Sequence, residues 1–99
     1  MIRGTTPTHI FNLPFAASTI SALSVTYKQD GETLLKKQKA DCTLDGNAVI
    51  VKLTQEESLK FTARDSVEVQ LKVKDASGDV IAHTVKSIPV KRILDEEVL

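Results

Sequence analysis

The chain is predicted to be an all-β protein, folded as a sandwich of two antiparallel sheets with about seven strands. Apolar and polar residues alternate repeatedly, most clearly where Val67, Val69, Leu71 and Val73 are separated by polar residues. Successive side chains of a strand point to opposite faces, so this period of two gives one buried and one solvated face. Turn-forming dipeptides separate the runs at the short spacing typical of sandwiches, which favours an immunoglobulin-like architecture.

Seven apolar-polar runs are interpreted as strands. They cover residues 8–13, 20–29, 32–38, 41–44, 48–53, 66–74 and 80–86. Pro14 ends the first strand, because proline has no N–H for a central ladder. The dipeptide Asp30-Gly31 predicts a tight hairpin, since glycine accepts a positive φ at little steric cost.

One short helical turn is expected near residues 54–60. Thr54 and Glu57 have the spacing of a capping box, in which each side chain binds the backbone N–H of the other residue. This turn would connect the two sheets and place Phe61 under it.

The apolar residues on the inward positions of these strands predict the core. It should contain Phe11, Leu13, Leu23, Val25, Val51, Leu53, Phe61, Val67, Val69, Leu71 and Val73.

The 99 residues fit one domain with two less regular ends. Residues 1–8 are expected to form an extended, loosely held arm, residues 9–91 the sandwich, and residues 92–99 a tail. The tail has apolar pairs on both sides of three acids, so it either packs on its own domain or docks on a neighbour. The candidate partner contacts are Ile2, Arg3, Arg92, Ile93, Leu94, Val98 and Leu99.

The charge balance excludes some partners. Thirteen Lys and Arg residues balance 13 Asp and Glu residues, so no long-range field would attract nucleic acid. Lys36, Lys37 and Lys39 are interpreted as solvated strand surface.

A single cysteine allows no internal disulfide. No apolar stretch fits a signal peptide or a membrane span, and we expect the protein to be soluble in the cytoplasm that makes it, without a membrane partner.

No constellation of catalytic or metal-ligating residues is found. His9 and His83 lie in separate strands without ligand spacing around them, and the cysteine, Cys42, has Asp41 beside it. No enzymatic activity, catalytic residue, cofactor, metal or small-molecule substrate is therefore expected. An enzyme of unrecognised type would need a deep pocket lined by one of the histidines and a carboxylate.

Several strings taken together carry a resemblance. They are MIRGTTPT at residues 1–8, LTQEESLKF at 53–61, VEVQLKV at 67–73, GDVIA at 78–82 and LDEEVL at 94–99. Over nearly the whole chain they resemble small uncharacterised proteins encoded among the late structural genes of phages and prophages of Gram-positive gut bacteria. More loosely, the second half is similar to the N-terminal β-sandwich of phage upper-baseplate proteins. The motifs transfer no functional residue.

The resemblance implies a virion component near the tail tip or baseplate, assembled in the bacterial host cytoplasm. The function expected is that of a non-enzymatic structural or adaptor protein, which self-associates and contacts other phage structural proteins. The alternative is a small phage-encoded binding protein that inhibits a host defence system. Such inhibitors often carry strong acidic charge, whereas this chain is neutral.

Overall fold

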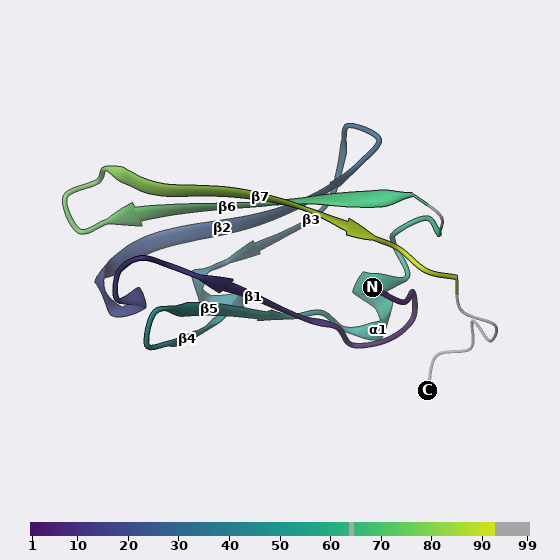
Figure 1. Ribbon diagram of the computed structural model, residues 1–99, viewed down its shortest axis with the longest axis horizontal. Coiled ribbons are helices and arrows are strands. Elements are labelled where there is room, and N and C mark those ends of the chain that lie inside the picture. The colour runs from purple at the N-terminus through teal and green to yellow at the C-terminus, as the bar shows by residue number, and fades with distance from the viewer. Residues whose placement is uncertain (64, 93–99) are drawn as a thin grey trace.

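The computed structural model describes residues 1–63 and 65–92, and only the backbone of residues 82–84. It confirms the two-layer β-sandwich (Figure 1). The described strands are β1 (Thr8–Asn12), β2 (Ile20–Gln29), β3 (Glu32–Gln38), β4 (Thr43–Asp45), β5 (Ala48–Lys52), β6 (Ser66–Asp75) and β7 (Val80–Pro89). Short helical turns are η1 (Ala17–Thr19), η2 (Lys39–Asp41) and α1 (Gln55–Ser58).

The two sheets contain three and four of the described strands. One has the order β1-β5-β4 and the other the order β3-β2-β6-β7, with antiparallel pairing throughout. In immunoglobulin constant domains the second strand lies in the same sheet as the first and fifth. Here β2 lies between β3 and β6 instead, so the sandwich has a strand order of its own. The outer strands β1, β4, β3 and β7 are the sheet edges.

The predicted hairpin between β2 and β3 is confirmed. Gln29 pairs with Glu32, and both intervening residues have positive φ, 52° at Asp30 and 76° at Gly31. Positive φ at both central residues defines a type I′ turn, whose twist matches that of the strands it joins. The capping box is also confirmed, since Thr54 and Glu57 each accept the backbone N–H of the other.

Two strand boundaries differ from the sequence prediction by more than one residue. β4 begins at Thr43 rather than residue 41, because Lys39–Asp41 form a turn in which Gln38 N–H donates to the Asp41 carboxylate. β7 continues to Pro89 rather than ending at residue 86. Its position at a sheet edge explains this, because an edge strand tolerates the missing N–H of proline.

The core lies between the two sheets and contains every residue predicted for it. Each of the 11 is buried, with Val25, Val51, Val67, Val69 and Leu71 at 0 % exposure. Further buried apolar residues are Ala17, Ile20, Tyr27, Leu35, Val49 and Val90. Each large side chain that is fully buried contributes about 1.5–3 kcal/mol of transfer free energy.

The N-terminal residues are not the loosely held arm that the sequence suggested. Ile2 forms a parallel bridge with Lys91, and the terminal ammonium of Met1 donates to the Pro89 carbonyl at 2.7 Å. The N–H of Gly4 donates to the buried Oγ of Ser58, the last residue of α1, at 2.9 Å. Residues 1–5 are therefore fixed against the end of the sandwich that carries α1 (Figure 1).

Candidate functional site

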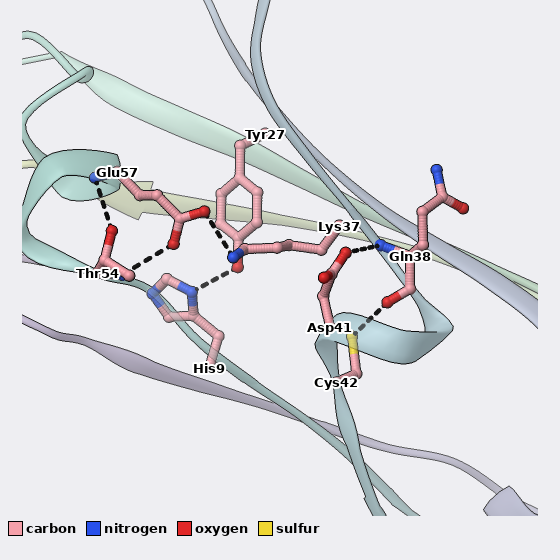
Figure 2. A network of polar contacts seen from close by, with 8 residues as sticks. All are labelled: His9, Tyr27, Lys37, Gln38, Asp41, Cys42, Thr54 and Glu57. Carbon is pink, nitrogen blue, oxygen red and sulfur yellow. Dashed lines mark hydrogen bonds and ion pairs between the residues drawn. The ribbon is translucent and has the colours of Figure 1, made fainter.

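A polar pair joins the two sheets inside the sandwich. The hydroxyl of Tyr27 on β2 lies 2.8 Å from Nδ1 of His9 on β1 (Figure 2). The two rings are tilted with centroids 5.6 Å apart, and the Tyr27 ring also packs at 5.9 Å against Phe61. The alternation in the sequence places both residues on inward positions, so the only tyrosine of the chain is fully buried.

Burial keeps both members of this pair neutral. It raises the pKa of Tyr27 well above its usual value of 10.0, assisted by the acidic groups Cys42 and Glu57. It also lowers the pKa of His9 below 6.5, and the positive charges of the N-terminus and Lys86 add to that effect. An uncharged phenol and an uncharged imidazole therefore share this hydrogen bond at neutral pH.

Next to this pair, an ion pair links β3 to α1. Lys37 Nζ lies 2.6 Å from the Glu57 carboxylate, and the two side chains are only 13 % and 18 % exposed. Burial opposes ionisation of Glu57, but the hydrogen bonds from Lys37 and from Thr54 N–H outweigh it and lower the pKa of this carboxyl. Figure 2 shows Lys37 extending toward Glu57 beside the Tyr27 hydroxyl.

The cysteine lies in the same region of the sandwich as this ion pair (Figure 2). Cys42 is half-buried, and its Sγ donates to the Gln38 carbonyl at 3.4 Å. Burial and the neighbouring Asp41 raise the pKa of the thiol, against a smaller opposite effect of Lys37. The group is a protonated packing side chain at neutral pH rather than a nucleophile. No buried polar side-chain atom in the described part of the chain is without a partner, so this network is suited to holding elements together.

A shallow hollow of about 290 Å³ lies on the outward face of the four-stranded sheet. Three lysines from two strands line it, Lys36 on β3 and both Lys72 and Lys74 on β6, and none of the described residues that line it is acidic. Ser24, Gln38 and the 63 % exposed Val80 complete much of the lining. The hollow therefore combines positive charge with an apolar rim.

The edge strand β7 exposes apolar side chains. Ile81 is 40 % and Val85 is 56 % exposed, and both lie on a ten-residue strand that has only one neighbour among the described strands. Long edge strands with apolar side chains are the usual places where another chain pairs. The β1 edge is different, because Lys86 Nζ binds the Ile10 carbonyl at 2.8 Å and lies 4.6 Å from the centre of the Phe11 ring.

The candidate contacts named from the sequence lie around the end of the sandwich that carries α1, as far as the structure describes them. Ile2 is 45 % exposed and Arg92 is exposed. The Arg3 guanidinium donates to the carbonyls of Phe61 at 2.6 Å and Leu59 at 3.0 Å, which gives it a role within its own chain. The other four, Ile93, Leu94, Val98 and Leu99, lie outside the described residues, as does the side chain of His83.

Sequence reasoning missed the lysine hollow. Alternation places Lys72 and Lys74 on the solvated face of their strand, but the pattern does not reveal that Lys36 lies nearby on the same face. The three clustered lysines of the sequence are in fact separated, since Lys37 binds Glu57 and Lys39 Nζ donates to the Ile20 carbonyl. The exposed residues of β7 are only weakly indicated by the sequence, in which Val80-Ile81-Ala82 is an apolar run without alternation.

Within the described residues no three His, Cys, Asp or Glu side chains are grouped as a metal site would require. The same residues include no helix with the length and hydropathy needed to cross a bilayer. Comparisons with protein-family models, with curated proteins and with solved structures gave no match.

Proposed function

We propose that this protein is a non-enzymatic structural or adaptor component of a phage tail or baseplate, which acts through protein–protein contacts. The observation that carries the proposal is the edge of β7, which no described strand pairs with and along which Ile81 and Val85 are exposed. A structural neighbour that adds a strand there would pair with free backbone groups and cover both side chains. The resemblance of the sequence strings to phage virion proteins indicates which kind of assembly would supply that neighbour.

The rest of the sandwich supports a role as a rigid spacer. Lys86 joins the two sheets from β7 to β1, and Lys37 joins β3 to α1, the turn between β5 of one sheet and β6 of the other. The N-terminal residues are fixed to the same body. A partner bound at the β7 edge would thus be held at a defined distance from one bound at the opposite end.

An inventory of purified virions by mass spectrometry tests the role. The protein should be present at a fixed copy number relative to the tail proteins, after assembly in the host cytoplasm. A protein that inhibits host defence would be absent from washed particles and bound to a host protein in infected cells. That result would overturn the proposal.

Charge on the β7 edge tests the contact. Lysines on an edge oppose strand addition, so Ile81→Lys with Val85→Lys should lower incorporation into particles at least about tenfold. Thr62→Lys, at an exposed position between α1 and β6, is the matched control and should be incorporated normally. Equal incorporation of both variants would exclude β7 as the docking edge.

A further inference from the structure

We propose that β7 pairs with β7 of a second copy of this chain, antiparallel and around a two-fold axis at Val85, so that two four-stranded sheets join into one. This rests on the proposed function and deepens it, by naming a second copy as the neighbour at the β7 edge. The register follows from the backbone of β7, from the ends of its open edge and from the charges beside it.

The backbone of β7 presents alternate residues to the edge. In an antiparallel ladder the N–H and C=O groups of successive residues point alternately toward a given neighbour and away from it. Val90 N–H donates to the Asp65 carbonyl, and the pairing with β6 continues from there without a shift to residue 82, so the even-numbered residues face β6. The backbone groups at positions 83, 85 and 87 therefore point away from the sheet.

Residues 1–3 of the same chain cover this edge just beyond its last open position. The Pro89 carbonyl accepts from the Met1 ammonium at 2.7 Å, and Lys91 N–H donates to the Met1 carbonyl at 2.7 Å. Both contacts agree with the alternation, because 89 and 91 are the next two outward positions. A second strand can therefore pair only with the part of the edge that precedes Pro89.

A bulge limits the edge at the other end. Ile81 is an extra residue in the pairing between β6 and β7, and such a bulge twists an edge and interrupts its regular hydrogen-bonding groups. The regular open edge is thus residues 82–88, whose middle residue is Val85. Only an antiparallel copy centred on Val85 uses this whole stretch, with 85 opposite 85 and 83 opposite 87, which gives about six backbone hydrogen bonds.

The side chains at the edge permit this pairing. Val85 is 56 % exposed, and its two copies would lie side by side across the axis and cover each other. A lysine on an edge strand ordinarily opposes strand addition. Lys86 does not, because its Nζ binds the Ile10 carbonyl on β1 and lies over the Phe11 ring, so its charge is directed under the sheet.

Charge on the neighbouring strand β6 matches a second copy in this register. Glu68 is paired with Ser87, and Lys72 is paired with position 83. When 87 lies opposite 83 of the second copy, Glu68 of each copy shares a row with Lys72 of the other, about 14 Å away between backbones. A register centred on position 83 would instead align the two copies of Lys72. The contact uses the same surface on both copies, so it closes as a dimer.

Added charge at the axis tests the contact in purified protein. The wild type should dimerise in sedimentation velocity at up to about 1 mM, and Val85→Lys should weaken dimerisation at least about tenfold, because two ammonium groups then meet. Thr33→Lys adds the same charge at an exposed position on β3, the other edge strand of this sheet, and should dimerise like the wild type. Circular dichroism should show that both variants are folded.

Cross-linking tests the register in a Cys42→Ser background, which removes the one native thiol. Oxidation by diamide should join Val85→Cys into disulfide-bonded dimers, since Cα atoms of a hydrogen-bonded pair are about 5.5 Å apart, within disulfide range. Ser87→Cys is the matched control at the next outward position. It lies about 14 Å along the strand from its own copy and should not cross-link.

Charge exchange tests the same register independently. Glu68→Lys and Lys72→Glu should each weaken dimerisation about threefold at low salt, because each aligns like charges across the interface. The double variant with both changes should regain wild-type dimerisation, since the opposite charges are then restored in exchanged positions.

A wild type that is monomeric up to about 1 mM, undiminished dimerisation of Val85→Lys, equal cross-linking at positions 85 and 87, or no recovery in the double variant would each overturn the proposal. Dimerisation that appears only after removal of residues 93–99 would do the same, by showing that the chain's own tail occupies the edge. Loss of Ile81→Lys with Val85→Lys from virions despite a monomeric wild type would mean that β7 docks a different protein. Failure here is therefore distinguishable from failure of the proposed function.

Discussion

Tyr27 and His9 are joined at 2.8 Å across the interior, one from each sheet of the sandwich. Neither residue carries charge at neutral pH, because burial disfavours the phenolate of one and the imidazolium of the other. The pair is a polar contact between two sheets that otherwise meet mainly through apolar side chains. The stability of the protein should therefore fall both at alkaline pH and in mild acid.

Alkaline pH should unfold the protein through Tyr27. The pKa of Tyr27 is raised in the folded state, so its contribution to stability is complete below pH 10 and is lost as pH rises further. Tyr27→Phe should remove this part of the alkaline loss of unfolding free energy and should cost about 0.5–1.5 kcal/mol at pH 7 for the lost hydrogen bond. Because Tyr27 is the only tyrosine and there is no tryptophan, ultraviolet difference absorbance follows its ionisation directly. A phenolate signal with a midpoint near 10 in folded protein would contradict the prediction.

Mild acid should weaken the protein through His9. The pKa of this imidazole is lowered in the folded state, so its contribution is present above pH 6.5 and is lost as pH falls through 6.5 toward the folded value. His9→Gln keeps a hydrogen-bonding group near Tyr27 but cannot titrate. Urea unfolding at pH 5 and pH 7 should give a smaller stability difference for His9→Gln than for the wild type. His83→Gln is the matched control, and a flattened profile in that variant alone would refute the assignment.

The ion pair between Lys37 and Glu57 should contribute measurably, because both side chains are mostly buried. A double-mutant cycle with Lys37→Gln and Glu57→Gln should give a coupling of about 1 kcal/mol, at the upper end for partly exposed pairs. The pKa of Glu57 is lowered, so this contribution is present above pH 4.5 and declines as pH falls below it. Glu56→Gln, at the exposed neighbouring position, should change little. Coupling near zero would show that the pair gives no net stabilisation.

Ser58 should hold the N-terminal residues in place. Its buried Oγ accepts the Gly4 N–H and lies 2.8 Å from the Thr5 carbonyl, to which it donates. Ser58→Ala leaves that N–H unpaired and should cost about 1–3 kcal/mol. Hydrogen exchange measured by NMR should show lost protection at Gly4 and at Arg3, whose N–H binds the Lys91 carbonyl, with little change in β6. Ser66→Ala, at an exposed position, is the control, and retained protection at Gly4 in Ser58→Ala would argue against this anchor.

The sequence predicts local structure here better than it predicts which strands lie side by side. Alternation identifies which face of β6 is buried, and Asp30-Gly31 identifies a hairpin, because both signals act over a few residues. Alternation does not reveal which strand lies beside β2, since every inward face is similarly apolar. The hollow depends on that pairing order, because Lys36 and Lys72 belong to strands separated by β2.

The hydrogen bonds that fix the N-terminal residues could not be predicted, for a different reason. Arg3 binds the carbonyls of Leu59 and Phe61, and Ser58 binds the backbone of Gly4 and Thr5. Backbone acceptors and donors are present at every residue, so no pattern of side chains marks them in advance. The edge of β7 was visible only as an apolar run without alternation.

The bridge between Ile2 and Lys91 places these two residues together at one pole of the molecule. Because Met1 and Lys91 lie at the same pole of the sandwich, a fluorescent protein or affinity label joined to the N-terminus would project from that pole. A label on Ser77, in the turn between β6 and β7, would mark the other pole (Figure 1). Energy transfer between labels at Ser77 and at the N-terminus would then report whether adjacent subunits in a particle point in parallel or in opposition.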